Sequence, residues 1–196
     1  NRGRSRRGSG PPRRASGPVC VGWTGSTTTI PHFETSVPYL AQIKAKYGDR
    51  VRFRVIGDGS YRNDALGVRG ESWEAEKEVG TLSAVDIGIM PLPDEPWSRG
   101  KCGLKGLQFM ALEVPVVMER LGVNQEIVAD GVNGFLASGQ AEWVARLSAL
   151  VDSPALRERL GSAGRQTVEA RYSVASQREV YSRALRRLCG RGVDTR

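Results

Sequence analysis

Residues 86–117 combine, in a fixed order, an apolar strand, a loop broken by prolines, a basic turn between glycines, a helix and a second strand. We predict the first strand at residues 87–90, the helix from about Leu104 and the second strand from Pro115. In an α/β sheet, this order places the loop and the helix N-terminus at the carboxyl edge of the strands, where such folds bind ligands. The segment therefore predicts both a fold class and the place of a site.

The rest of the chain alternates strands with helices rather than with hairpin turns. A strand at residues 18–22 runs into a turn of glycines and hydroxyls, the helix that follows ends near Gly48, and residues 51–56 form the next strand. From Ala141 onward, apolar residues recur at helical spacing. We therefore predict an α/β fold: a parallel sheet with helices on both faces and a helical C-terminal end.

Residues 68–73 lead into a predicted acidic helix. Glu74, Glu76 and Glu78 are interpreted as its solvated face, and Trp73 as its anchor in the core. Because a run of charges is usually a solvated surface, this helix gives no functional signal.

The formal net charge of +8 is concentrated at one end of the chain. Residues 1–18 contain six arginines and no acid, so the remaining chain is nearly balanced. A segment rich in Arg, Gly, Ser and Pro has few apolar residues to bury, so we predict a disordered basic leader at residues 1–18. We predict one domain at residues 19–188, an ordinary length for a single domain, and a disordered tail at residues 189–196.

Several classes of site are disfavoured by missing residue types. His32 is the only histidine, Asp-x-Asp does not occur, and the cysteines have no Cys-x-x-Cys spacing. We therefore expect no metal site, no disulfide framework and no Ser-His-Asp triad. Cys20 fits a core position and Cys102 lies in the basic turn. His32 stands beside the glycine turn and is interpreted as a surface residue, with ligand contact as the alternative.

The sequence also bears on location. No apolar run approaches the roughly 20 residues of a membrane helix, so we expect no membrane span. No apolar segment follows the N-terminal arginines, so a secretory signal is unsupported. We expect a cytoplasmic protein, and a peripheral position at the inner face of the membrane is left open.

The basic turn and the helix start form a candidate anion site. Lys105 and Gln108 are three residues apart and share one helix face. The other face, expected to pack on the sheet, consists of Leu104, Leu107 and Ala111. Unpaired amides at the helix N-terminus, the helix dipole, Lys101 and Lys105 would together bind a phosphate. The alternative is that both lysines are only solvated, but the flanking glycines and the strand-end position favour a site.

Two loops offer further contacts. The turn at Gly25 and Ser26 is of the type that lets backbone amides approach a ligand, although any tight crossing from a strand to a helix uses the same residues. In the loop before the basic turn, Asp94 or Glu95 would receive sugar hydroxyls and Trp97 would stack on a ring. An exposed acidic loop accounts for these residues equally well.

Taken together, these segments resemble the C-terminal, donor-binding half of the family 4 retaining glycosyltransferases, or glycosyl transferases group 1. The matching segments, in order, are GWTGS, RVIGDG, DIGIMPLPDEPW, GKCGLKGLQFMALEVPVV and GVNQEIVADGVNGFL. The resemblance covers about residues 19–188, and the order and spacing of several segments make it specific. It implies a Rossmann-like domain that is one half of a two-domain glycosyltransferase B-type fold.

The resemblance also implies a reaction. A hexosyl group would be transferred from a UDP- or GDP-sugar to an unknown acceptor, with retention of configuration and without a metal ion or other cofactor. Lys105, with Lys101 and with Glu95 from the loop, would be the catalytic residues. The donor-binding residues would be Gly25, Ser26, Ser72, Trp73, Gly103, Leu104 and Gln108.

The chain departs from the family's pattern in specific places. The family's paired glutamates correspond to Gly100 and Gln108, so either Asp94 or Glu95 substitutes from the loop or the chemistry differs. Glu113 stands where a glycine is common after the helix. The N-terminal acceptor domain of the family is missing from this sequence.

Two other functions remain open at this stage. A basic protein would use the arginine leader to bind nucleic acid and keep the α/β domain as a scaffold. Because the domain itself is nearly balanced in charge, nucleic acid is the less favoured partner. The second alternative is an inactive, truncated fragment.

Overall fold

The computed structural model describes residues 17–189. Most of the predicted leader at residues 1–18 and of the predicted tail at residues 189–196 lies outside the described residues. Val19 begins the first strand and Cys189 ends the last helix. The whole of the predicted domain is therefore described.

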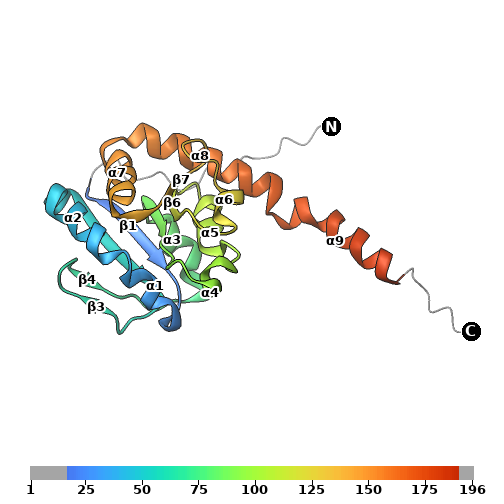
Figure 1. The fold of residues 1–196 in the computed structure, drawn as a ribbon, viewed down its shortest axis with the longest axis horizontal. Helices are drawn as coiled ribbons and strands as arrows, with labels where there is room; N and C mark the ends of the chain where they lie inside the picture. Colours follow the sequence, from blue (N-terminus) through green and yellow to red (C-terminus); the bar gives the residue numbers. More distant parts are fainter. Residues whose placement is uncertain (1–16, 190–196) are drawn as a thin grey trace, which may run out of the picture.

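A five-stranded parallel sheet forms the centre of the domain (Figure 1). Its strands are β1 Val19–Thr24, β2 Val51–Ile56, β5 Ile87–Met90, β6 Val116–Glu119 and β7 Phe135–Ala137. They lie in the order β2-β1-β5-β6-β7, and every adjacent pair is parallel. The predicted parallel sheet is confirmed, and the strands expected at residues 51–56 and 87–90 have those bounds.

Helices cover both faces of the sheet, as predicted (Figure 1). One face carries α1 Ile30–Glu34, α2 Val37–Tyr47 and α7 Gly139–Asp152. The other carries α3 Glu78–Ser83, α5 Leu104–Ala111 and α6 Asn124–Ile127. Leu40 and Trp143 are fully buried in the first hydrophobic cluster, and Phe109 and Ile127 in the second. The sheet is therefore the shared wall of two cores.

Shorter or later elements complete the domain. α8 Pro154–Arg171 packs beside α5 and α7. The short elements are η1 Thr27–Thr29, η2 Gly48–Arg50 and α4 Pro96–Arg99.

Facing glycines let a helix approach the middle of the sheet. Gly22 of β1 pairs with Gly88 of β5. A Cβ on Gly88 would lie 2.5 Å from the ring of Phe109, and a Cβ on Gly22 would lie 2.5 Å from a methyl carbon of Val85. Because Phe109 occupies the space above Gly88, α5 lies close against β5, and its N-terminus reaches the carboxyl edge of the sheet.

The buried face of α5 differs from the prediction. Leu104 is 57% exposed, and Leu107 and Ala111 are only partly buried. The buried residues are instead Gly106, Phe109 and Met110. A Cβ on Gly106 would lie 2.4 Å from the sulfur of Met118, so the glycine side is the one that fits against the sheet. Leu104, in the first turn, faces solvent at the edge.

Residues 57–83 also differ from the prediction. They form a short antiparallel hairpin, a 3-10 turn and α3. The hairpin strands are β3 Arg62–Asn63 and β4 Val68–Arg69, and the turn is η3 Ala75–Lys77. Only the end of the predicted acidic helix is α-helical. The proposed core anchor is wrong, because Trp73 is 50% exposed.

Hydrogen bonds made by Glu71 fix the path of the backbone in residues 57–83. Its N–H donates to the carbonyl of Val55 at 2.9 Å, and its own carbonyl accepts from the N–H of Gly57 at 2.7 Å. Its carboxylate accepts from Nε of Arg54 at 2.7 Å and from Nη2 at 2.5 Å. These contacts continue the sheet beyond β2 and leave Trp73 just past its carboxyl edge.

The last helix, α9 Val174–Cys189, projects away from the rest of the domain (Figure 1). It has no buried residue. Large apolar side chains are nevertheless exposed along it, at Val174, Val180, Tyr181, Leu185 and Leu188. Within residues 17–189, no helix combines the length and the apolar composition that a membrane crossing requires.

The turn after α5 accepts a glutamate at a position that favours glycine. Glu113 has a φ of 59°, and it is the one non-glycine residue with positive φ in the described part of the chain. A Cβ costs roughly 1–2 kcal/mol in this conformation. α8 holds the turn, since a Cβ on Gly161 would lie 2.0 Å from the carbonyl oxygen of Glu113.

Glu113→Gly should raise the free energy of unfolding by about 0.5–1 kcal/mol, because relief of the left-handed strain exceeds the added flexibility of the unfolded chain. Guanidinium denaturation measures the change. Glu113→Gln is the matched control: it keeps the strained backbone and removes the exposed ion pair with Arg165, at 3.8 Å, so it should stay within about 0.5 kcal/mol of the wild type. A glycine variant no more stable than the glutamine variant would contradict the assignment of strain.

Candidate functional site

A cavity of about 460 Å³ lies at the carboxyl ends of β1 and β2, against the first turn of α5. The order of the sheet changes direction between β1 and β5, and open α/β sheets leave a crevice at that point. The volume is within the range of small-molecule sites. The lining consists of Thr24 at the end of β1, residues 25–27 and Thr29 after it, Gly57 after β2, Trp73 and Glu78 around η3, and Leu104, Lys105 and Gln108 on α5.

Backbone contacts fix the glycine turn after β1. The N–H of Gly25 donates to the carbonyl of Ile56 at 2.9 Å. A Cβ on Gly57 would lie 1.8 Å from the carbonyl oxygen of Gly25, so the two turns meet backbone to backbone. The N–H of Ser26 donates to Oγ1 of Thr29 at 2.9 Å, which closes the start of η1. The turn therefore presents a rigid wall to the cavity.

The first turn of α5 offers unpaired amides. Gly103 is the N-cap residue, with a φ of 73°, and it has no side chain to cap the helix. The first N–H groups of a helix have no intrahelical acceptor, so those of Leu104 and Lys105 can bind an anion. The positive φ favours glycine at this position, and a Cβ there would have to displace the end of the Ile127 side chain, whose Cδ1 would lie 2.3 Å away.

The side chain of Lys105 reaches from the first turn of α5 to η1, which follows the glycine turn. Its Nζ donates to Oγ1 of Thr29 at 3.2 Å and lies 4.9 Å from the centroid of the Trp23 ring. Burial, helped by the charge of Lys101, lowers the pKa of Lys105 to about 8. The amine lacks a carboxylate within ion-pair distance in the described part of the chain. An anion in the cavity would therefore meet a partly desolvated, uncompensated positive charge.

The interpretation of His32 as a surface residue is wrong. His32 is only 8% exposed, because α1 folds its side chain inward, and its Nδ1 has no hydrogen-bond partner among the described residues. Burial lowers the pKa of His32, the charges of Lys101 and Lys105 lower it further, and Glu95 opposes them. The charges of these three side chains therefore act on His32.

The loop before α5 stands apart from the cavity lining. Arg99 pairs with Asp94 at 2.7 Å, and Trp97 is 73% exposed. Nζ of Lys101 lies 4.8 Å from the centroid of the Trp97 ring. Neither Glu95 nor Lys101 lines the cavity. The loop has the features of an exposed acidic segment, and its contact with a sugar stays a prediction.

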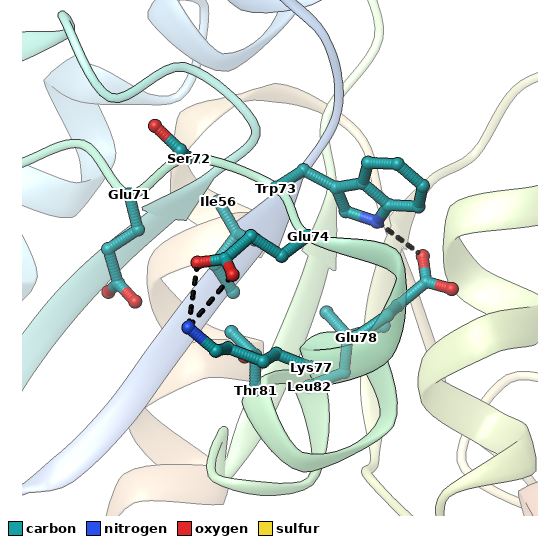
Figure 2. Close-up of a pocket in the computed structure, with 9 residues that line it drawn as sticks. All are labelled: Ile56, Glu71, Ser72, Trp73, Glu74, Lys77, Glu78, Thr81 and Leu82. Atoms are coloured by element: carbon teal, nitrogen blue, oxygen red, sulfur yellow. Dashed lines mark hydrogen bonds and ion pairs between the residues drawn. The ribbon is translucent and has the colours of Figure 1, made fainter.

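A second, smaller cavity of about 220 Å³ shares lining residues with the first, and Figure 2 shows the side chains that line it. Both cavities are lined by Trp73 and Glu78. Ser72 lines only the smaller one, where Lys77 pairs with Glu74 at 2.8 Å. Within residues 17–189, no cluster of three or more His, Cys, Asp or Glu side chains is placed to hold a metal ion.

The structure brings most of the predicted donor-binding residues together. The cavity is lined by Gly25, Ser26, Trp73, Leu104, Lys105 and Gln108, with Gly103 next to it. Ser72 is in the adjoining cavity. Sequence reasoning missed Gly57, Thr29 and Glu78, and it assigned Glu78 to a solvated face. The signal available for Gly57 was its position at the end of a strand, whereas nothing local marked Glu78.

Residues 20–153 match the family described as glycosyl transferases group 1. The chain belongs to this family. An alpha-maltose-1-phosphate synthase of Mycobacterium tuberculosis is 35% identical over 116 residues, which are 55% of this chain and 29% of that protein. The aligned part therefore spans less than a third of that relative.

Solved glycosyltransferase structures share the fold. Sucrose-phosphate synthase from Thermosynechococcus elongatus superposes with a TM-score of 0.74 at 22% identity, covering 90% of this chain and 47% of that one. Anabaena Alr3699/HepE, in complex with UDP-glucose, superposes with a TM-score of 0.69 at 18% identity, covering 86% and 48%. The predicted Rossmann-like half of a glycosyltransferase B-type fold is confirmed.

The lowered pKa of Lys105 predicts a pH dependence. Only the protonated amine attracts an anion, and in the free protein it loses its proton as the pH rises through about 8. The affinity for an anion bound at this amine should therefore be highest below pH about 8 and fall by up to tenfold per pH unit above it. Calorimetric titrations between pH about 7 and 9 measure this fall.

Lys105→Gln is the control for the pH experiment, since it keeps a polar side chain that does not titrate. It should bind more weakly at pH about 7 and show a nearly flat profile over the same range. A wild-type affinity that stays constant across this range, or a glutamine variant with the same decline, would contradict the role of the Lys105 charge.

Proposed function

We propose that the chain is the donor-binding half of a retaining glycosyltransferase, which transfers a hexosyl group from a UDP- or GDP-sugar to an acceptor. The observation that carries the proposal is one cavity shared by Lys105, the first turn of α5 and the glycine turn after β1. Membership of the family supports the reaction class. The UDP-glucose complex of the Anabaena neighbour supports a nucleotide sugar as the ligand.

Each part of the cavity has a role in this proposal. The amides near Gly103 and Leu104 and the amine of Lys105 bind the diphosphate. Their effect grows as negative charge develops on the departing nucleoside diphosphate, because the groups are already in place and partly desolvated. Gly25 and Ser26 form the facing wall, and the segment at Ser72 and Trp73 lies beside the base.

In this proposal, the loop before α5 contacts the sugar, and transfer proceeds without a metal ion. Lys101 and Glu95, which influence the charge of His32 from the loop side, would face the transferred sugar. The lysines and the helix dipole supply the positive charge that a metal ion would otherwise provide, so transfer needs no metal. EDTA should therefore leave donor binding unchanged.

The acceptor would be bound by a separate N-terminal domain. This chain covers 47% of the Thermosynechococcus structure and 48% of the Anabaena structure, and donor and acceptor must be oriented together for transfer. The 196-residue chain alone should bind a donor and transfer slowly or not at all.

Calorimetric titration with UDP, GDP and ADP at pH about 7 tests the proposed function. At least one nucleotide should bind with a submillimolar dissociation constant, and Lys105→Ala should weaken that binding by about tenfold or more, as expected for a hydrogen bond to a charged group. Lys44→Ala, on α2 and outside the cavity lining, should leave it unchanged.

Two results would overturn the proposal. One is the absence of binding for all three nucleotides at millimolar concentration. The other is binding that Lys105→Ala leaves intact, which would place the ligand elsewhere on the protein.

A further inference from the structure

The amine of Lys105 can be reached from the larger cavity, because Lys105 is part of its lining. The side chain is partly buried, and its Nζ lies beside the Trp23 ring. Within residues 17–189, its one hydrogen bond goes to the neutral hydroxyl of Thr29. The other lysines of the chain, none of which lines this cavity, are Lys44, Lys46, Lys77 and Lys101. Lys105 is therefore the lysine that a small molecule in the cavity would meet.

The surroundings of this amine disfavour its protonated form. The charged and titratable groups near it are Lys101 in the loop before α5, His32 on α1 and Glu78 on α3. Lys101 repels a second positive charge, and so does the positive end of the α5 dipole. Glu78 accepts hydrogen bonds from two uncharged side chains, an indole and an amide. Among the described residues, no ion pair joins Glu78 to Lys105.

These surroundings make a neutral amine available near physiological pH. Burial, and then the charge of Lys101, lowers the pKa of Lys105 to about 8. At pH about 7.5, about a quarter of the chains therefore carry a neutral Lys105, against roughly one in a thousand for a solvated lysine. A neutral amine has a free lone pair, and desolvated lysines act as nucleophiles for this reason.

The cavity also suits the transition state of an attack on a carbonyl group. The unpaired N–H groups that follow Gly103 lie in the same helical turn as Lys105. Such amides stabilise the negative charge that develops on a carbonyl oxygen when a nucleophile adds to the carbon. The volume of about 460 Å³ admits a small acyl compound. An activated acyl group is therefore the electrophile that matches the amine and its surroundings.

We propose that Lys105 is a site of acylation by small activated acyl compounds, either acyl phosphates or acyl thioesters, and that the modification closes the anion site. The neutral Nζ attacks the acyl carbonyl carbon, and a C–N bond forms. The C–O bond to phosphate, or the C–S bond to the thiol, breaks, and the leaving group takes its electron pair. The nitrogen then gives its proton to water, so no oxidant or further reactant is needed.

Acylation and donor binding would exclude one another at this residue. An amide nitrogen carries no charge, so an acylated Lys105 no longer attracts a phosphate. A bound diphosphate in turn holds the amine in its protonated form and covers it, so the donor protects Lys105 from acylation. This consequence rests on the proposed function, whereas the reactivity of the amine does not.

Competitive acetylation of the wild-type chain measures the reactivity. The 196-residue chain is treated at pH about 7.5 with limiting acetyl phosphate or, in a second arm, with S-acetyl-N-acetylcysteamine, and mass spectrometry measures the acetylation of each lysine. In at least one arm, Lys105 should react about tenfold faster than any other lysine, because its larger neutral fraction outweighs its lower basicity and its burial. The faster arm identifies the class of acyl compound.

The pH profile and two variants test the cause of the reactivity. The rate at Lys105 should level off above pH about 8, whereas the rate for Nα-acetyl-lysine in the same solution should rise up to pH about 10. Lys101→Met removes the repelling charge and should slow Lys105 by about twofold at pH about 7.5. Lys44→Met, on α2 and outside the cavity lining, is the matched control and should leave the rate at Lys105 unchanged.

A titration of the acetylated chain tests the closure of the site. The tightest-binding nucleotide among UDP, GDP and ADP should bind about tenfold more weakly after acetylation of Lys105, as expected for the loss of a hydrogen bond to a charged group. The same nucleotide at millimolar concentration should protect Lys105 during the labelling.

The outcomes separate this inference from the function beneath it. The proposal is overturned if Lys105 reacts no faster than the other lysines in both arms, or if its rate follows the profile of Nα-acetyl-lysine. Selective acetylation that leaves nucleotide affinity unchanged would overturn the closure of the anion site. A chain that binds none of the three nucleotides before treatment would overturn the proposed function, and the labelling ratio would still decide the reactivity of Lys105.

Discussion

The parallel pairing of β1 with β5 is the constraint on which the site depends. It places Gly22 opposite Gly88, and the missing Cβ of Gly88 leaves the space that the Phe109 ring occupies. Phe109 thereby seats α5 against the sheet with its first turn at the carboxyl edge. The turn after β1 ends at the same edge, so Lys105 reaches Thr29 at 3.2 Å. A packing contact in the core thus determines the geometry of an anion site.

The cavity separates charge along one helix face. Lys105 lies beside Trp23, and its burial there holds its pKa near 8. No described carboxylate neutralises the Lys105 amine. Gln108, less than one turn further along, contacts an acid instead. The resemblance to glycosyltransferases places a glutamate at position 108, whereas this chain has an amide there that orients Glu78 from another element. The same end-to-end polarity would orient a ligand with an anionic and a hydroxyl-bearing part.

Local patterns predicted the sheet and the cationic half of the site, because strand burial and the shared face of Lys105 and Gln108 are encoded within a few residues. Local patterns failed where a contact between residues distant in sequence determines the path of the backbone. Glu71 continues the sheet through bonds to Val55 and Arg54, and this contact carries residues 72–78 to the cavity. A charge run looks solvated in sequence, so nothing local separated Glu78 from its neighbours. The face of α5 was also misassigned, since the fit of its glycine against the sheet outweighs simple apolar periodicity.

A crystal structure of the chain with the nucleoside diphosphate that binds most tightly tests the central claim most directly. The account predicts the diphosphate at the first turn of α5, with oxygens at about 3 Å from the amine of Lys105 and from the N–H groups that follow Gly103. The ribose would lie beside Gln108 and the base near Trp73. A nucleotide bound away from this turn, or one whose phosphates face solvent with Lys105 still on Thr29, would contradict it.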